Sequence, residues 1–218
     1  NNILNESVAE NSTYPSREGY SVGAIFAYKT AGLDEDGYPL FLAKDGTTQT
    51  AAEFFKLNRF GASTLSAEEQ RNLYSYMGTT DPKCSGGFIN TFEWGDWILN
   101  ANFIFNLGMK VRVQPSYSPT YFDRGLNTNH DILNRWTTTN TNSNMPALMV
   151  NTAARANEYT HYSEYNTYSM LDIWVRDRNY CRLQSVRLAY RIPKSILAPI
   201  GISSASVSLE GRNLFVLS

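Results

Sequence analysis

The stretch WILNANFIFNLGMK, residues 97–110, decides the fold class because its two parities, the odd-numbered and the even-numbered residues, differ in chemistry. One parity is apolar and holds Trp97, Leu99, Ala101, Phe103, Phe105 and Leu107. The other parity carries three amides, Asn100, Asn102 and Asn106. Successive side chains of a β-strand point to opposite faces, so the stretch predicts a strand that is apolar on one face and amide-rich on the other. The apolar face must lie against the second sheet of a soluble core or against lipid.

The composition of the chain is compatible with either environment. The 218 residues carry a formal net charge of −1, which gives no indication of nucleic acid as a partner. Charged residues make up 18% of the chain and aromatic residues 13%. No apolar run approaches the ~18 residues of a membrane-spanning helix. Transmembrane barrel strands are half polar, so they leave the mean hydropathy unremarkable.

Strand and turn signals continue on both sides of the quoted stretch. Residues 88–94 predict a strand, and the two-residue turn Gly95-Asp96 joins it to the next strand, so residues 87–109 predict a hairpin. Alternating residues predict further strands over 19–30, 186–192 and 204–210.

One helix is predicted over residues 66–77. Ser66 and Glu69 have the spacing of a capping box, and Gly78 is placed to end the helix.

The connections between the predicted strands are unequal in length. Those at 95–96 and 193–203 are short, whereas 114–170 is long and rich in Asn, Thr, Ser and Tyr. Its low-complexity part, residues 137–144, is not expected to join a core. If neighbouring strands pair antiparallel, the short connections share one end of the sheet. This asymmetry favours an outer-membrane barrel over a β-sandwich.

The remaining reactive side chains predict no cofactor and no metal. Cys84, in a glycine-flanked loop, and Cys181, in a predicted strand, have no metal-ligand spacing and are expected as unrelated thiols rather than a disulfide. The acidic stretch 34–37 lacks the full spacing of a calcium loop and is expected as a plain turn. His130 and His161 fall in polar sequence and are expected as solvated imidazoles.

The closing stretch YCRLQSVRLAYRIPKSILAPIGISSASVSLEGRNLF, residues 180–215, resembles the C-terminal signature of SusC-like TonB-dependent transporters. That signature is an Arg-Leu pair, an alternating strand, a helical turn and a strand ending in Asn-Leu-Phe. The matching residues are Arg182, Leu183, Val186, Leu188, Tyr190, Pro193, Asn213, Leu214 and Phe215.

Earlier blocks resemble the same family in the same order. They are GAIFAYKTAGLDEDGYPLF (23–41), GTTDPKCSGGFINTFEWGDWIL (78–99), Arg135-Trp136 and Met145-Pro146. The resemblance runs from about residue 17 onward. Two departures are the Thr/Asn sequence in place of the Pro-Gly-Asp that often follows the Arg-Trp pair, and Cys181 in place of an aliphatic residue.

The resemblance implies an all-β fold, namely the C-terminal portion of a transmembrane antiparallel β-barrel with long extracellular loops and one short loop helix. Residues 1–218 are then a partial barrel domain without the plug domain and the final strands. The apolar parity of 97–107 would face outer-membrane lipid, and Asn100, Asn102 and Asn106 would face the lumen. On its own, the chain is expected to aggregate or to pair with another chain, because its sheet would keep two open edges.

The family resemblance also implies a function, the import of large nutrients across the outer membrane of a Gram-negative bacterium. The expected cargo is an oligosaccharide or a peptide. The expected partners are a SusD-like surface lipoprotein, which closes over the barrel as a lid, and a TonB-type energy-coupling protein, which acts on the plug. Loop aromatics that could stack on cargo are Tyr117, Tyr121, Trp136 and Tyr162.

Two other function classes compete with this one. A soluble surface β-sandwich could bind glycans through the same aromatic and Asn-rich loops. A glycoside hydrolase would need two carboxylates placed about the scissile bond, and Asp123, Asp131 and Glu164 lie in loop sequence with nothing to mark them. The chain is therefore expected not to be an enzyme.

Overall fold

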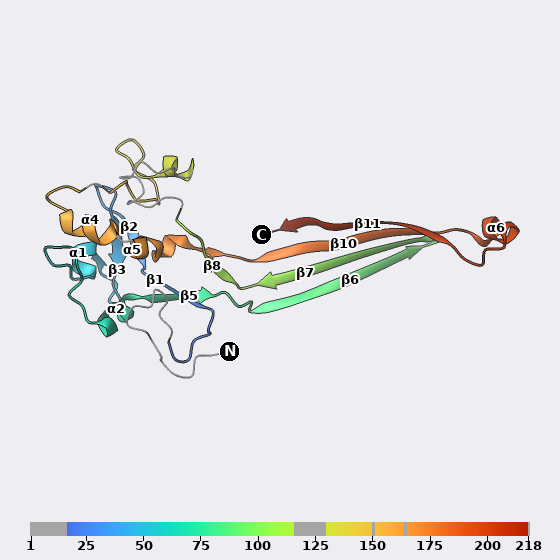
Figure 1. The fold of residues 1–218 in the computed structure, drawn as a ribbon, viewed down its shortest axis with the longest axis horizontal. Helices are drawn as coiled ribbons and strands as arrows, with labels where there is room; N and C mark the ends of the chain where they lie inside the picture. Colours follow the sequence, from blue (N-terminus) through green and yellow to red (C-terminus); the bar gives the residue numbers. More distant parts are fainter. Residues whose placement is uncertain (1–16, 116–129, 150, 164, 218) are drawn as a thin grey trace. The chain divides into compact units, whose positions relative to one another are not determined.

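The computed structural model describes residues 17–115, 130–149, 151–163 and 165–217, which form two compact units (Figure 1). Unit 1 comprises Asn1–Thr80 and Lys110–Arg176, and unit 2 comprises Asp81–Met109 and Asp177–Ser218. The described residues include no helix long and apolar enough to cross a membrane.

Unit 2 is built on one antiparallel sheet of four long strands (Figure 1). The strands are β6 (Cys84–Trp94), β7 (Trp97–Leu107), β10 (Tyr180–Arg191) and β11 (Ser206–Leu217), in the spatial order β11-β10-β7-β6. Gly95 adopts a φ of 59°, which suits the two-residue turn that closes the hairpin. The predicted hairpin and the two later strands are confirmed.

Both short connections of unit 2 lie at the same end of this sheet. Trp97, which follows the hairpin turn, pairs with Tyr190 near the end of β10. The Arg191 amide donates to the Asp96 carbonyl at 2.8 Å. The connection from β10 to β11 contains the helical turns α6 (Lys194–Leu197) and η3 (Ala198–Ile200). The two short connections therefore share an end, as their lengths predict.

Two details of unit 2 differ from the predicted pattern or add to it. The first strand of the hairpin begins at Cys84 and not at Phe88, because Cys84 and the residues after it pair in register with the end of β7. Cys84 thus lies in a strand and not in a loop, and both it and Cys181 are free thiols. A register shift between Leu183 and Ser185 marks a bulge in β10.

Unit 1 contains short elements only. Its strands are β1 (Ala24–Ala27), β2 (Thr30–Leu33), β3 (Pro39–Leu42), β4 (Thr48–Gln49), β5 (Ser75–Thr79) and β8 (Lys110–Arg112). A further strand, β9 (Val175–Asp177), begins in the last two residues of unit 1. Its helices are α1 (Ala51–Phe54), α2 (Ala67–Leu73), η1 (His130–Asn134), α4 (Ala156–Ser163), α5 (Tyr165–Ser169) and η2 (Asp172–Trp174). The strands form small sheets in the orders β1-β5, β2-β3-β4 and β8-β9.

The single strand predicted over 19–30 is wrong in extent, since the chain forms two separate strands, β1 and β2. Tyr28 lies between them and makes an isolated parallel bridge to Leu171. Its amide donates to the Met170 carbonyl at 2.9 Å. Pairing with Leu171, which is distant in sequence, therefore interrupts the strand that the alternation over 19–30 predicts.

The predicted helix begins as expected but ends early. Ser66 and Glu69 form the capping box at the start of α2. The helix stops at Leu73, because Tyr74 is extended, with a ψ of 139°, and stacks on Tyr28 with ring centroids 4.2 Å apart. Gly78 lies inside β5 and does not end the helix.

The core of unit 1 is aromatic. Phe41, Phe54 and Phe55 contribute from the first half of the unit. The long connection 114–170, whose low-complexity part is largely exposed as expected, supplies Met149, Tyr162 and Tyr168, and Leu171 and Trp174 follow directly after it. Part of the long connection is thus core sequence.

Candidate functional site

One face of the sheet in unit 2 is apolar across all four strands except at Asn90, which pairs with Ala101. Cross-strand pairs place Trp94, Trp97, Tyr190 and Val207 in one row and Phe92, Leu99, Leu188 and Leu209 in the next. Phe88, Phe103, Leu183 and Phe215 form a further row. Many of these side chains are exposed, with 54% of Phe92 and 79% of Leu209 accessible. An apolar face of this extent is typical of a surface that contacts another molecule or a membrane.

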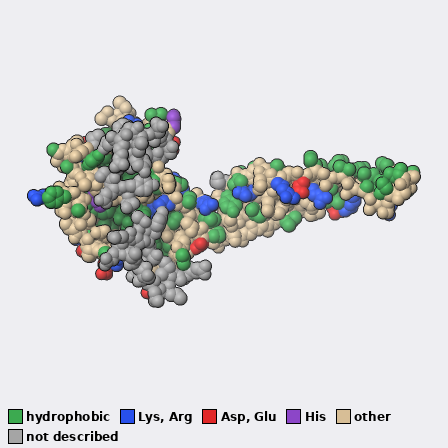
Figure 2. Space-filling view, in the orientation of Figure 1, with side chains coloured by type: hydrophobic (Ala, Val, Ile, Leu, Met, Phe, Trp, Pro, Cys, Tyr) green, Lys and Arg blue, Asp and Glu red, His purple; other side chains and the backbone are tan. Residues whose placement is uncertain are grey.

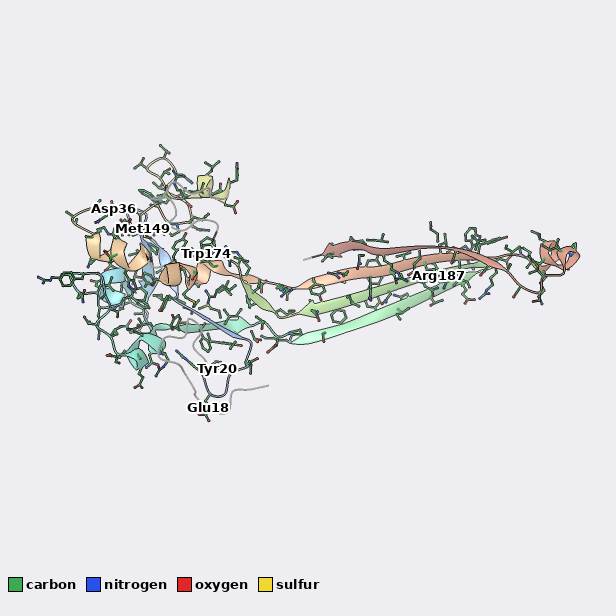
Figure 3. All side chains as sticks on the ribbon, viewed as in Figure 1. Glu18, Tyr20, Asp36, Met149, Trp174 and Arg187 are labelled. Carbon is green, nitrogen blue, oxygen red and sulfur yellow. The ribbon has the colours of Figure 1, made fainter. Side chains whose placement is uncertain are left out.

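The opposite face holds every charged residue of the four strands. They are Glu93, Arg182, Arg187, Arg191, Glu210 and Arg212. Figure 2 shows basic and acidic side chains along this sheet, and Figure 3 labels Arg187 on it. Arg191 pairs with Glu93 at 3.2 Å and Arg212 with Glu210 at 2.8 Å. Charge is therefore separated from the apolar face along the whole sheet.

The three amides of β7 share this charged face and bond across the strands. The Thr91 hydroxyl donates to Asn100 at 2.7 Å, the Asn102 amide donates to Gln184 at 3.1 Å, and the Asn106 amide donates to the Tyr180 hydroxyl at 2.6 Å. These bonds satisfy polar groups that would be costly to bury in an apolar medium.

Two apolar residues of β7 do not follow the alternation that the sequence predicts. Ile98 and Ile104 lie on the amide face, opposite Ala189 and Arg182 of β10. They were visible in the sequence as interruptions of the polar parity. The amide face is therefore mixed, whereas the apolar face carries no charge.

In unit 1, the acidic turn at 34–37 is held by Arg155. Its guanidinium contacts Asp34 at 2.7 Å, Asp36 at 3.3 Å and Glu158 at 2.8 Å, and lies 3.7 Å from the ring centroid of Tyr38. Burial lowers the pKa of Arg155, but its bonds to Glu158 and Asp34 outweigh this and raise it overall. Among the described residues no group of three His, Cys, Asp or Glu is placed to hold a metal ion.

The expectation that His161 is a solvated loop imidazole is wrong. His161 lies in α4, with its ring centroid 4.4 Å from that of Phe55. Burial lowers the pKa of His161 from 6.5 to about 4, so the ring is neutral at pH 7.

The four candidate cargo-stacking aromatics do not form one cluster in the described part of the chain. Tyr117 and Tyr121 lie outside the described residues. Trp136 packs on the acidic turn, where a side chain at Gly37 would collide with its ring. Tyr162 is fully buried and stacks against Phe41, with centroids 6.2 Å apart. Tyr162 is a core residue in this structure and offers no free face to a sugar ring.

We expect Tyr162→Phe to leave stability unchanged or to raise it by up to about 1 kcal/mol, because the buried Tyr162 hydroxyl has no hydrogen-bond partner among the described residues. Thermal unfolding of the full-length protein in detergent measures this, with the exposed Tyr76→Phe as a neutral control. A clear loss of stability would show that the hydroxyl has a partner.

Comparison with known proteins gives a consistent result. The chain is 23% identical over 205 residues, 93% of its length, to TonB-dependent receptor P3 of Formosa agariphila, and 28% identical over 150 residues to receptor P26 of the same organism. The resemblance to TonB-dependent receptors is confirmed. No protein-family model matches the chain.

Solved structures share the fold. The RagAB peptide importer in its open-open state matches 99% of this chain at a TM-score of 0.66 and 22% identity. A RagAB peptide transporter structure matches 89% of this chain at a TM-score of 0.62 and 20% identity. The chain spans 18% of receptor P3 and 21% of the first RagAB chain, so it corresponds to about a fifth of such receptors.

Proposed function

We propose that this chain is the C-terminal part of an outer-membrane TonB-dependent importer and that the sheet of unit 2 is a section of its barrel wall. The apolar face would contact lipid, and the face with Asn100, Asn102 and Asn106 would line the lumen. The observation that carries this proposal is the one-sided charge distribution. An Arg on the lipid face near mid-bilayer would cost about 2–4 kcal/mol, and all charges of the four strands avoid that face.

Strand length and aromatic placement support the same proposal. The four strands have 11 or 12 residues, close to the ~9–11 of a transmembrane β-strand. Trp94, Trp97 and Tyr190 adjoin the hairpin turn on the apolar face. Aromatic rings of this kind are enriched at membrane interfaces.

In this proposal the importer takes up a large nutrient, either an oligosaccharide or a peptide. A SusD-like lipoprotein covers the barrel, and a TonB-type protein acts on a plug domain outside this chain. The chain performs no bond-breaking chemistry. The RagAB structures are named as peptide importers, which supports import as the function class. A soluble β-sandwich is not favoured, since the four long strands of unit 2 form one sheet and not two.

The proposal places the turn at Gly95-Asp96 in the periplasm and the 114–170 connection outside the cell. In the full-length protein without native cysteines, we expect Asn142→Cys to react with an impermeant maleimide on intact cells. The matched variant Asp96→Cys should react only after the outer membrane is opened. Both positions are exposed on the protein surface, so a difference in labelling reports the side of the outer membrane on which each residue lies. Labelling of Asp96→Cys but not Asn142→Cys on intact cells would overturn the topology.

A further inference from the structure

Unit 1 contains a groove that none of the sites above uses. Two pockets of about 270 and 330 Å³ share Asn144, Ile173 and Arg176 as lining residues, so they adjoin one another as two lobes. The first lobe is also lined by Thr30, Gly32, Leu33, Pro39, Ser143, Pro146 and Leu171. The second is also lined by Asp131, Asn134, Met145 and Trp174. We call the two lobes together the 144–176 groove.

One wall of the groove is fixed by hydrogen bonds between distant segments. The Thr30 hydroxyl donates to Asp172 at 2.6 Å, and the Thr30 amide donates to the same oxygen at 3.2 Å. The Asp172 amide in turn donates to the Tyr28 carbonyl at 3.0 Å. The segment that carries Ile173, Trp174 and Arg176 is therefore held against β2.

The other wall is fixed by Ser143. Its hydroxyl donates to the Asn134 carbonyl at 2.5 Å and accepts from the Met145 amide at 2.9 Å. The Trp136 amide donates to the Met145 carbonyl at 2.9 Å. Both walls are thus fixed by hydrogen bonds within the chain itself, which lowers the ordering cost of binding.

The lining of the groove combines aliphatic side chains with one exposed cation, Arg176. Leu33 and Ile173 line the first lobe and are half-buried, whereas Leu171, Pro39 and Pro146 behind them are fully buried. Arg176 is exposed, and its guanidinium has no carboxylate partner within the described ranges. The indole nitrogen of Trp174, which Figure 3 labels, is buried without a hydrogen-bond partner in the same ranges. Asp131 is the acidic residue among the lining side chains.

We propose that the 144–176 groove binds the carboxyl-terminal end of a short peptide. The peptide carboxylate would pair with Arg176, whose planar fork matches a carboxylate. An apolar side chain would lie against Leu33 and Ile173, which keep accessible surface, and Asp131 would accept a peptide N–H. This rests on the proposed import function and assigns its cargo to peptides. An acidic sugar also offers a carboxylate, but Trp174, the aromatic residue among the groove's lining residues, is 4% accessible and presents no open ring face for a sugar to stack on.

Isothermal titration on the detergent-purified full-length protein tests this. The probes are a leucine-terminated pentapeptide as the free acid, the same peptide as the C-terminal amide, and a trigalacturonate. We expect the free acid to bind about tenfold or more tightly than the amide, a loss of the size seen when a charged hydrogen-bond partner is removed. Equal affinity for acid and amide would overturn the proposal, as would tighter binding of the trigalacturonate.

Variants locate the binding. Arg176→Gln should remove the preference for the free acid, and Asn144→Trp should block both lobes while it keeps Arg176. Arg59→Gln is the matched control, because Arg59 is a cation of unit 1 that lies over Phe60 and does not line the groove. Unchanged peptide affinity in both groove variants would refute the site. The proposed import function is tested separately, by fractionation of the same full-length protein. Recovery of the protein outside the outer membrane would refute import, whatever the groove binds.

Discussion

Phe103→Arg is expected to prevent most of the full-length protein from accumulating in the outer membrane. Phe103 lies near the middle of β7 on the apolar face, between Phe88 and Leu183. An arginine there would enter acyl chains at a cost of about 2–4 kcal/mol. Immunoblots of outer-membrane fractions, with the heat-dependent gel shift of a folded barrel, measure the effect.

The neighbouring Ile104→Arg is the matched control for this change. It also replaces a large apolar side chain of β7 by arginine, but on the amide face, beside Asn102 and opposite Arg182. Asn102→Arg is a second variant on that face. Asn102→Arg should assemble at a level near the unmodified protein, and Ile104→Arg, although it sets an arginine opposite Arg182, should lose far less than Phe103→Arg. Equal loss in Phe103→Arg and Ile104→Arg would show that the two faces do not differ in environment.

Arg155→Ala is expected to destabilise unit 1 by about 3–5 kcal/mol, the usual effect of removing one partner of a buried ion pair. Only 16% of the Arg155 side chain and 9% of the Glu158 side chain is accessible, so the carboxylate would be left buried and unpaired. Arg155→Lys keeps the charge but loses the fork that reaches both Asp34 and Glu158. Hydrogen exchange of α4 amides in the full-length protein reports the local unfolding free energy.

Lys56→Ala is the control for this second prediction. Lys56 contacts Glu69 at 4.0 Å, and both side chains are more than half accessible. Exposed ion pairs contribute about 0–1 kcal/mol, so exchange in α2 and α4 should change little. A loss of protection as small in Arg155→Ala as in Lys56→Ala would show that the ion pairs of Arg155 with Asp34 and Glu158 do not stabilise unit 1.

The sheet of unit 2 was predictable because its signals are local. Alternation in 97–107 and a two-residue turn determine a hairpin without any knowledge of the rest of the chain. The start of α2 was predictable for the same reason, since Ser66 and Glu69 lie three residues apart. The end of α2 was not, because Tyr74 leaves the helix to stack on Tyr28.

The candidate sites of unit 1 could not be predicted from local pattern. Arg155 joins the acidic turn across 121 positions, and Thr30 joins Asp172 across 142. Tyr162 reads as a polar loop aromatic in its own neighbourhood, and only packing against Phe41 makes it a core residue. The 144–176 groove depends on three segments that meet only in the folded unit.

The pairing of β8 with β9 has a consequence for the order of folding. The β6–β7 hairpin closes through two residues and belongs to events of ~1–10 μs. Pairing of β10 with β7 must instead bring Tyr180 to Asn106, across the long intervening stretch. The cost of such loop closure rises by about 0.6 kcal/mol for each doubling of its length. β8 and β9 lie at the two ends of that stretch and are neighbours in one sheet. We therefore expect collapse of the intervening residues to come first and to set the rate at which β10 joins the hairpin.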